Sequence, residues 1–233
     1  MTIPFNTIKG LLFDKDGTLF DFQQSWSDWC HRFIHSVAKD AERRVALGST
    51  LGFDLERRTF LPESAVIAGT PEDTVNAVAS VFPELDQNAV RELIVTSSAE
   101  DFQVPVAPLP ELFEQLQSFG LKLGIATNDA EVPARAHLSQ FALTSFFDFI
   151  AGYDSGYGAK PSPGQMNGFL AQFGMAPREA IMIGDSTHDL EAGRAANMYT
   201  IGVLTGVAPD HVLAPYADLI LPDISALPAL FAR

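Results

Sequence analysis

The second half of the chain alternates short apolar runs with stretches of helical periodicity, and this alternation restricts the possible folds most. Between residues 109 and 221 the apolar runs are short, and the stretches between them carry apolar side chains at steps of three and four. A chain that alternates in this way builds a parallel sheet with helices on both faces, so the predicted class is α/β with a doubly wound parallel sheet. The expected strands are residues 8–13, 121–126, 147–151, 181–183, 199–203 and 217–221.

Residues 21–105 interrupt this pattern with helices alone. Apolar residues from Trp26 to Val45 recur at helical steps and predict one amphipathic helix, and two more are expected after capping signals at Thr70 and Asp86. No strand is expected between residues 22 and 103, and the proline-rich run VPVAPLP then forms a semi-rigid connector. We therefore predict a Rossmann-like core of residues 1–20 and 106–233. Between its two parts we predict an all-helical cap domain of residues 21–105, called the insertion below.

The charge and composition exclude several classes of protein. The chain has 15 Lys and Arg residues against 29 Asp and Glu residues, a net charge of −14, so it repels nucleic acid and anionic membrane surfaces. Its single cysteine, Cys30, excludes an intrachain disulfide and a zinc site built from cysteines. The N-terminus lacks a signal-peptide pattern, and no apolar run approaches the roughly 20 residues of a membrane helix. We expect a cytoplasmic globular protein that binds neither nucleic acid nor membranes.

Polar and charged residues lie in the segments that follow four of the expected strands. They are Asp14 and Asp16 after the first strand, Thr127 and Asn128 after the second, Lys160 after the third, and Asp185 and Asp189 after the fourth. Because the carboxyl ends of parallel strands share one edge of the sheet, these side chains should lie together. Packed carboxylates repel one another and need a divalent cation, and Mg²⁺ prefers oxygen ligands. With a cation and a lysine present, a phosphate dianion can approach a carboxylate nucleophile, and a second carboxylate can transfer a proton.

Four segments, LLFDKDGTLF, GIATND, GAKP and IGDSTHD, resemble in order the signature motifs of the haloacid dehalogenase superfamily. With a helical insertion between the first two motifs, the chain resembles the phosphoglycolate phosphatase-like branch. The resemblance implies that Asp14 is the nucleophile that forms an aspartyl-phosphate, with its other oxygen on Mg²⁺. It implies that Asp16 is the general acid and base, with its backbone carbonyl on the metal, and that Lys160 neutralises the nucleophile and the phosphate.

The resemblance also implies supporting residues around these groups. Thr127 and the backbone amide of Asn128 would hold the phosphoryl oxygens, and Asp185 would be the main acidic metal ligand. Asp189 and Thr18 would not bind the metal themselves but would hold its ligands in position. From the residues alone, Asp189 is equally well explained as an acid in the first turn of a helix.

Some residues carry expectations of their own. Lys15 stands where this branch usually has an apolar residue, and alternation in an extended segment predicts that it points away from Asp14 and Asp16. His188, inside the fourth motif, is expected to be an exposed helix residue. One arginine of the insertion would reach the far end of an acidic substrate, unless these residues only form solvated surface or ion pairs. The candidates are Arg43, Arg44, Arg57 and Arg58.

The sequence therefore predicts an enzyme that hydrolyses a phosphate monoester of a small metabolite, and the branch suggests phosphoglycolate. A sugar phosphomutase with the same aspartyl-phosphate and a non-catalytic binding module of the same fold remain alternatives. A dehalogenase lacks the second aspartate, so Asp16 argues against it. A phosphonate hydrolase would need an imine-forming lysine in the insertion, where Lys39 is the only lysine and falls off the apolar stripe.

Overall fold

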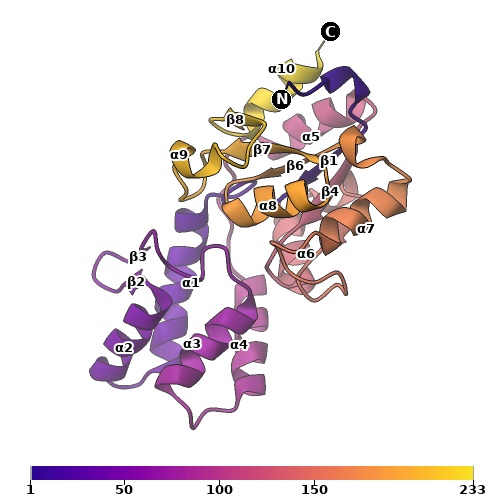
Figure 1. The fold of residues 1–233 in the computed structure, drawn as a ribbon. Helices are drawn as coiled ribbons and strands as arrows, with labels where there is room; N and C mark the ends of the chain where they lie inside the picture. Colours follow the sequence, from indigo (N-terminus) through magenta and orange to yellow (C-terminus); the bar gives the residue numbers. More distant parts are fainter. Residues whose placement is uncertain (1, 233) are drawn as a thin grey trace.

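A six-stranded parallel sheet, in the order β5-β4-β1-β6-β7-β8, forms the centre of the protein (Figure 1). The computed structural model describes residues 2–232. The strands are β1 (Gly10–Phe13), β4 (Lys122–Ala126), β5 (Phe149–Ala151), β6 (Ala180–Gly184), β7 (Tyr199–Val203) and β8 (Leu219–Leu221). Each expected strand is present, with ends that differ by at most two residues from the expected ones. The predicted α/β class with a doubly wound parallel sheet is confirmed.

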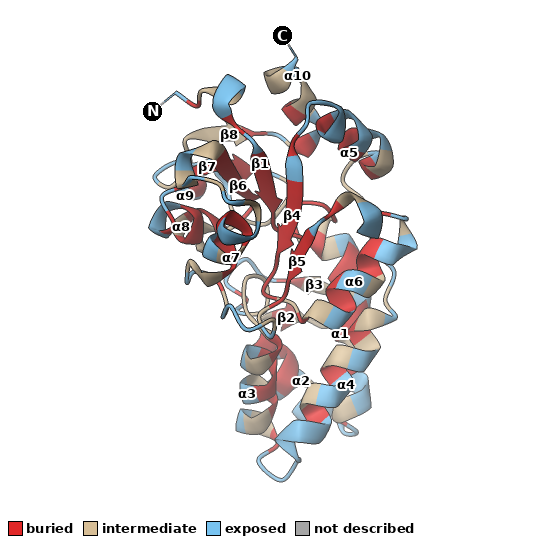
Figure 2. Cartoon of the chain, turned by 90° about the vertical axis from the view of Figure 1, so that its right-hand side faces the viewer, coloured by how far each residue is buried: buried red, intermediate tan, exposed pale blue. Residues whose placement is uncertain are grey.

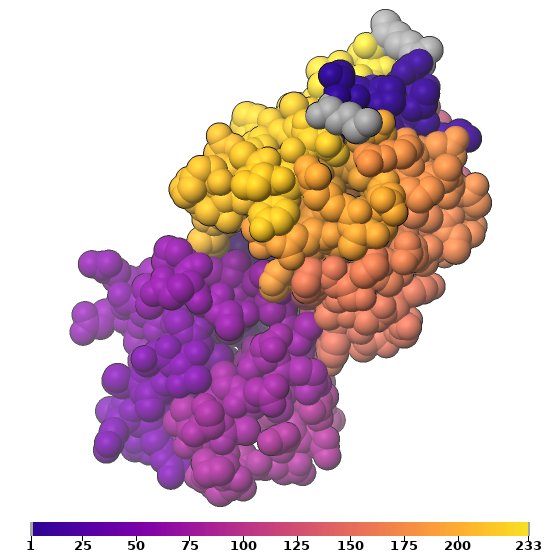
Figure 3. Space-filling view, in the orientation of Figure 1, coloured from indigo at the N-terminus to yellow at the C-terminus, as the bar shows by residue number. Residues whose placement is uncertain are grey.

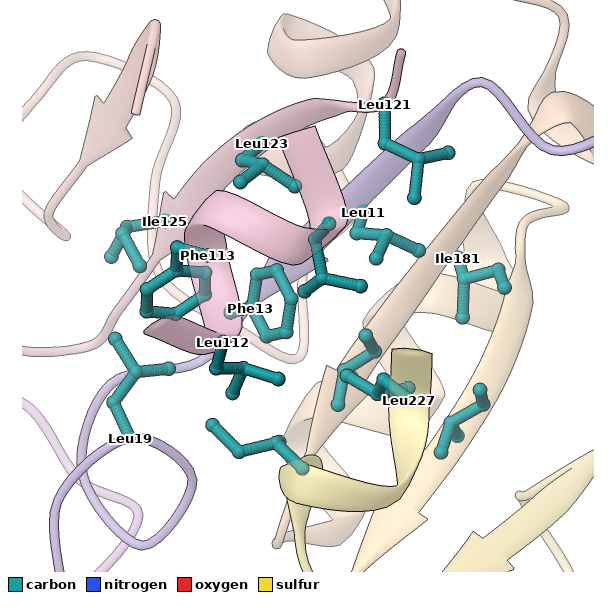
Figure 4. Packing of buried hydrophobic residues seen from close by; sticks show 14 of the residues in the cluster. Leu11, Phe13, Leu19, Leu112, Phe113, Leu121, Leu123, Ile125, Ile181 and Leu227 are labelled. Atoms are coloured by element: carbon teal, nitrogen blue, oxygen red, sulfur yellow. The ribbon is translucent and has the colours of Figure 1, made fainter. Parts of the chain in front are cut away.

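Helices cover the sheet on both faces, so that β1, β6 and β7 are buried at every residue (Figure 2). The helices of this part are α5 (Leu109–Ser118), α6 (Glu131–Gln140), α7 (Gly164–Phe173), α8 (Thr187–Ala195), α9 (Asp210–Leu213) and α10 (Leu227–Phe231). Successive residues of β1 point to opposite faces. Leu11 and Phe13 pack into the cluster that contains α5 and α10, and the Phe13 ring lies 5.5 Å from that of Phe113 (Figure 4). Leu12 packs with α7 on the other face.

The insertion forms a second group of helices beside the carboxyl edge of the sheet (Figure 1), and the space-filling view shows it as a lobe of its own (Figure 3). Its helices are α1 (Phe22–Val37), α2 (Ala41–Leu51), α3 (Pro71–Val81) and α4 (Gln87–Ala99), which share a hydrophobic cluster of their own. The expected starts after Thr70 and Asp86 are confirmed.

The prediction of one continuous helix from Trp26 to Val45 is wrong. The chain breaks after Val37 because the Asp40 carboxylate accepts a hydrogen bond from the backbone N–H of Arg43 and starts α2 there. The Val45 side chain, assigned to the apolar stripe, is 64% exposed. Apolar periodicity continued across the break, whereas the capping signal at Asp40 marks it.

The expectation of no strand in the insertion is also wrong. β2 (Phe53–Asp54) and β3 (Thr59–Phe60) form a short antiparallel hairpin. The rings of Phe53 and Phe60 lie 5.0 Å apart, and the Gln23 side chain accepts from the Phe60 backbone N–H at 3.0 Å and donates to its carbonyl at 2.9 Å. Strands of two residues are too short to show an alternating pattern.

The chain enters and leaves the insertion at neighbouring points. An isolated antiparallel bridge joins Phe20 to Pro105. The Asp21 backbone N–H donates to the Val104 carbonyl at 2.8 Å, and the Val106 N–H donates to Leu19 at 3.0 Å. This pairing supports the proposed division into residues 1–20 with 106–233 and residues 21–105.

Candidate active site

One buried ammonium group joins the ends of three strands at the carboxyl edge of the sheet. Lys160 Nζ lies 2.6 Å from Asp14 Oδ1, 2.7 Å from Asp189 Oδ1 and 2.7 Å from the carbonyl oxygen of Ala126. Asp14 follows β1, Ala126 ends β4 and Asp189 lies in the first turn of α8 after β6. The structure therefore brings together Asp14, Lys160 and Asp189, which are distant in the sequence, as the strand-end argument predicts.

Three buried carboxylates crowd around this lysine. Oxygen atoms of Asp14, Asp185 and Asp189 all lie within 4.8 Å of one another. The Thr18 hydroxyl, also buried, donates to Asp185 Oδ1 at 3.3 Å. Burial raises the pKa of Asp14 to about 7 against the opposing effect of Lys160, and burial together with Asp14 raises the pKa of Asp185 well above its usual range. The protein's own cations thus leave this cluster short of positive charge.

This donor set fits a divalent cation such as Mg²⁺. The cluster presents only carboxylate oxygens, which hard cations prefer. Its three carboxylates also outnumber the single positive charge of the neighbouring lysine. Asp14 and Asp185 are the members that were expected to bind metal. The carboxylate of Asp16 lies outside this cluster. Asp16 was expected to bind the metal through its backbone carbonyl, and that contact stays a prediction.

Asp189 fits the explanation as an acid in the first turn of a helix and also contacts the central lysine, while its support of the metal site stays a prediction. Its Oδ2 accepts hydrogen bonds from the Ser186 backbone N–H at 3.0 Å and from the Ser186 hydroxyl at 2.7 Å, as an acid in a first helical turn does. Its other oxygen contacts Lys160. The start of α8 therefore also positions one partner of the central lysine.

Asn128 holds the backbone of Lys160 and also contacts the insertion. Its Oδ1 accepts from the Lys160 N–H at 2.8 Å, and its Nδ2 donates to the carbonyls of Lys160 at 3.0 Å and Ala68 at 2.9 Å. Thr127 is 1% exposed, and its hydroxyl oxygen accepts from the Asp129 backbone N–H at 3.1 Å. Both residues line the pocket with Asp14, and their contacts with phosphoryl oxygens stay predictions.

The expected direction of Lys15 is wrong with respect to Asp16. The Lys15 ammonium is fully buried and lies 2.7 Å from both carboxylate oxygens of Asp16 and 3.2 Å from Asp129 Oδ2. Backbone alternation does separate it from Asp14, which pairs with Lys160 instead. The flexible side chain of Lys15 bends back because a buried ammonium needs partners.

His137 is a further buried group at the site that the sequence analysis missed. Its Nδ1 lies 3.0 Å from the Lys15 ammonium, and its Nε2 lies 2.7 Å from the Ser98 carbonyl on α4. The Trp26 indole of α1 donates to Asp16 Oδ1 at 2.8 Å. Two helices of the insertion thereby contact the network around Asp16, and the position of His137 within an ordinary helical pattern gave no signal of this.

Replacing His137 is expected to change the pH dependence of stability. Burial, and then the charge of Lys15, lowers the pKa of His137 from 6.5 to about 3. The unfolded chain therefore binds a proton below pH 6.5 that the folded protein does not, so this contribution is complete above pH 6.5 and falls as the pH falls. Between pH 7 and 5 the wild type should lose about 2 kcal/mol more unfolding free energy than His137→Gln.

Urea unfolding at the two pH values, in EDTA, measures this difference. His211→Gln is the control, because His211 is exposed and should keep the wild-type pH dependence. An equal loss in wild type and His137→Gln would contradict a buried neutral imidazole.

Two glycines leave space for the Asp185 carboxylate. A Cβ added at Gly206 would lie 1.7 Å from Asp185 Oδ2, and one added at Gly17, where φ is +84°, would lie 2.3 Å from the same atom. The Thr205 hydroxyl donates to the Gly17 carbonyl at 2.6 Å and so ties the two glycine segments together. Asp185 is therefore confined on two sides by backbone that tolerates no side chain.

Gly206→Ala is expected to displace the Asp185 carboxylate and to lower turnover by roughly 100-fold, because ångström-scale misplacement at a reacting centre has effects of this size. Gly202→Ala in β7 is the control, since its Cβ would meet its nearest neighbour, Leu213, at an ordinary 3.4 Å. Steady-state kinetics with any accepted phosphate ester compare the two variants. Similar rates for both would show that Asp185 tolerates the displacement.

A pocket lies between the carboxyl edge of the sheet and the insertion, and it contains Asp14, Asp16 and Lys160. His188 lines it half-buried, with Nδ1 3.1 Å from the Ala68 carbonyl, so the expectation of an exposed helix residue is wrong. None of the four candidate arginines lines it, so the structure gives no support to the hypothesis that one of them reaches the substrate. Among the described residues, no helix is both long and apolar enough to span a membrane.

Comparisons with known proteins agree with this geometry. Residues 11–203 match the family model of haloacid dehalogenase-like hydrolases. Over 225 residues the chain is 33% identical to a phosphoglycolate phosphatase of Aquifex aeolicus (90% of this chain, 94% of that protein). It is 25% identical over 225 residues to the pyrophosphatase PpaX of Bacillus velezensis (91% and 95%). A solved structure, a putative haloacid dehalogenase-like hydrolase of Bacteroides fragilis, shares the fold with a TM-score of 0.74 at 21% identity (94% and 99%).

Proposed function

The chain belongs to the haloacid dehalogenase-like hydrolases, and from this membership we propose that it is a Mg²⁺-dependent phosphatase that hydrolyses the phosphate monoester of a small molecule. The observation that carries the proposal is the Asp14 carboxylate held 2.6 Å from the buried Lys160 ammonium, within a cluster of carboxylates. A lysine so placed lowers the repulsion between an anionic nucleophile and an approaching phosphate dianion.

In the first step an oxygen of Asp14 attacks the phosphorus atom, and the bond from phosphorus to the ester oxygen breaks. Asp16 donates a proton to the departing oxygen, so that an alcohol leaves and an aspartyl-phosphate remains on Asp14. Thr127 and the backbone amide of Asn128 hold the phosphoryl oxygens. Lys160 balances charge on Asp14 and on the phosphoryl group throughout.

In the second step a water molecule attacks the aspartyl-phosphate. Asp16 accepts a proton from this water, inorganic phosphate leaves, and the Asp14 carboxylate is regenerated. Asp14, Asp185 and the backbone carbonyl of Asp16 would hold the Mg²⁺ ion, with Thr18 and Asp189 orienting Asp185 and Lys160. When bound, the ion supplies positive charge that offsets the charge of the phosphate and the carboxylates.

Metal removal is the direct test. EDTA should abolish phosphate release from a panel of small phosphate monoesters, and Mg²⁺ in excess should restore it, because one lysine does not balance the carboxylate cluster. Phosphate release is measured with and without EDTA, together with the melting temperature to verify that the EDTA-treated protein remains folded. Turnover that persists in EDTA would contradict the metal requirement. No release from any ester by folded protein with Mg²⁺ would contradict the phosphatase itself.

The sugar phosphomutase is the nearest rival, because it would use the same aspartyl-phosphate. It would need a bisphosphate to charge the enzyme and would return phosphate to a second hydroxyl of the substrate. Release of inorganic phosphate in proportion to ester consumed, without added bisphosphate, separates the two activities.

A further inference from the structure

The insertion contributes a wall of uncharged side chains to the pocket that contains Asp14. The bulkier apolar members of this wall are Phe22, Trp26, Trp29, Val66, Ile67 and Ile94. Its polar members carry hydroxyl groups and are Thr70, Thr74 and Ser98. The indole N–H groups are already engaged, that of Trp26 with Asp16 and that of Trp29 with the Ser97 hydroxyl. Beyond the phosphate, the wall therefore offers hydrocarbon surface and a few hydroxyls.

Part of this wall contacts residues at the carboxyl edge of the sheet. The carbonyl oxygen of Ala68 accepts from Asn128 Nδ2 at 2.9 Å and lies 3.1 Å from His188 Nδ1. Val66 and Ile67 directly precede this contact, and both are half-buried while packing against the hydrophobic cluster of the insertion. The apolar wall thus lines the same pocket as Asp14.

No basic side chain of the insertion reaches that space. Its seven Lys and Arg residues all lie outside the pocket lining: Arg32, Lys39, Arg43, Arg44, Arg57, Arg58 and Arg91. Four of them pair with carboxylates elsewhere, Arg32 with Asp101, Arg43 with Glu84, Arg57 with Asp54 and Arg91 with Glu72. Of the described residues that line the pocket, Lys160 alone is a lysine or arginine, and it already lies between two carboxylates.

This distribution of charge discriminates between leaving groups. The phosphate of any substrate lies at Lys160 and the carboxylate cluster. A carboxylate or a second phosphoryl group on the leaving side would lose its water against indole and aliphatic side chains, with no lysine or arginine of the insertion to pair with it. An uncharged hydrocarbon in the same place gains from leaving water.

We propose that the alcohol released by this enzyme is an uncharged alkyl or aryl alcohol, without a carboxylate or a second phosphoryl group. The inference rests on the proposed phosphatase function and specifies its substrate class. It places phosphoglycolate and inorganic pyrophosphate among the poor substrates. This differs from the resemblance to the phosphoglycolate phosphatase-like branch, which suggests phosphoglycolate as the substrate.

Two isosteric esters test the inference, 3-methylbutyl phosphate and 3-phosphooxypropanoate, which differ in an isopropyl group replacing a carboxylate. We expect kcat/KM to be at least tenfold higher for the 3-methylbutyl ester. An equal or higher value for the carboxylate ester overturns the inference.

Acetyl phosphate separates failure of the inference from failure of the proposed function. Hydrolysis that requires Asp14 would support the function whatever the order of the two esters. If no phosphate compound is hydrolysed, the proposed phosphatase function is wrong. The inference about the leaving group is then tested by the binding of two phosphonates. Titration calorimetry with Mg²⁺ compares 4-methylpentylphosphonate with 4-phosphonobutanoate, and tighter binding of the carboxylate compound, or equal binding, overturns the inference.

A charge added to the wall provides the reverse test. Ile67→Lys should improve kcat/KM for 3-phosphooxypropanoate relative to 3-methylbutyl phosphate by at least tenfold. Val45→Lys adds the same charge at an exposed position on α2 outside the pocket, and should leave the ratio unchanged. An unchanged ratio in Ile67→Lys, with the protein folded, would show that this wall does not face the leaving group and would overturn the inference.

Discussion

Asp14→Asn is expected to abolish turnover, with kcat reduced by at least about 10⁴-fold, because an amide oxygen cannot act as the nucleophile that the proposed reaction requires. The substitution keeps the shape of the side chain at the end of β1. Phosphate release from acetyl phosphate measures the loss. Asp28→Asn is the matched control, since Asp28 is exposed on α1 and its replacement should leave kcat within twofold. Residual turnover above one per cent would assign the nucleophile to another group.

The same variant should be more stable than the wild type when metal is absent. Burial raises the pKa of Asp14 to about 7. A carboxyl group with a raised folded-state pKa contributes its stability at low pH, and this contribution is lost as the pH rises through about 7. At pH 8 in EDTA, Asp14→Asn removes an ionised group from a crowded cluster, so its unfolding free energy should rise by on the order of 2 kcal/mol. Chemical denaturation measures it, and a lower value than wild type would contradict the charge imbalance.

Lys160→Met is expected to have the opposite effect on stability while also abolishing activity. The substitution keeps the volume of the side chain but leaves Asp14 and Asp189 buried without their cation. Removing one partner of a buried ion pair costs about 3–5 kcal/mol. Turnover should fall by at least about 10³-fold, because the positive charge next to the attacking carboxylate is lost.

Denaturation curves and phosphate release again provide the measurements. Lys122→Met is the control, because Lys122 is half exposed and its ion pair with Asp148 lies on the surface, where such pairs contribute little. If Lys160→Met unfolds no more easily than Lys122→Met, the carboxylates are balanced by something other than Lys160. Together, Asp14→Asn and Lys160→Met change the two ends of one 2.6 Å contact, and opposite shifts in stability identify it as the centre of the site.

The parts of the fold that could be predicted are the strands and helices whose pattern of apolar residues extends over several positions of the chain. Each strand of the sheet is covered on both faces, so its apolar run is continuous, and the helices between strands have an apolar stripe facing the sheet. The break between α1 and α2 was missed because apolar periodicity continues across it, while a single side chain, that of Asp40, ends the pattern. The β2–β3 hairpin was missed because strands of two residues are too short to show alternating apolar and polar residues.

In the site, residues placed by the backbone were predictable and residues placed by flexible side chains were not. Asp14 and Asp185 meet because they directly follow the parallel strands β1 and β6, which end at the same edge of the sheet. Lys15 contacts Asp16 because its long side chain bends towards partners that the sequence pattern does not specify. His137 could not be identified for the same reason, since its role depends on its distance from Lys15 in the folded protein.

The pairing of the two connections at Phe20 and Pro105 has a consequence for how the protein folds. β1 pairs with β4, although 122 − 13 = 109 positions separate Phe13 from Lys122 along the chain. Closing a loop of that length is entropically unfavourable. Once the insertion has folded and joined its own two ends, the loop that remains is several times shorter, which lowers the closure cost by roughly 1 kcal/mol. Early folding of the insertion therefore speeds the first long-range pairing of the sheet, and variants that destabilise α1–α4 should slow refolding of the whole chain.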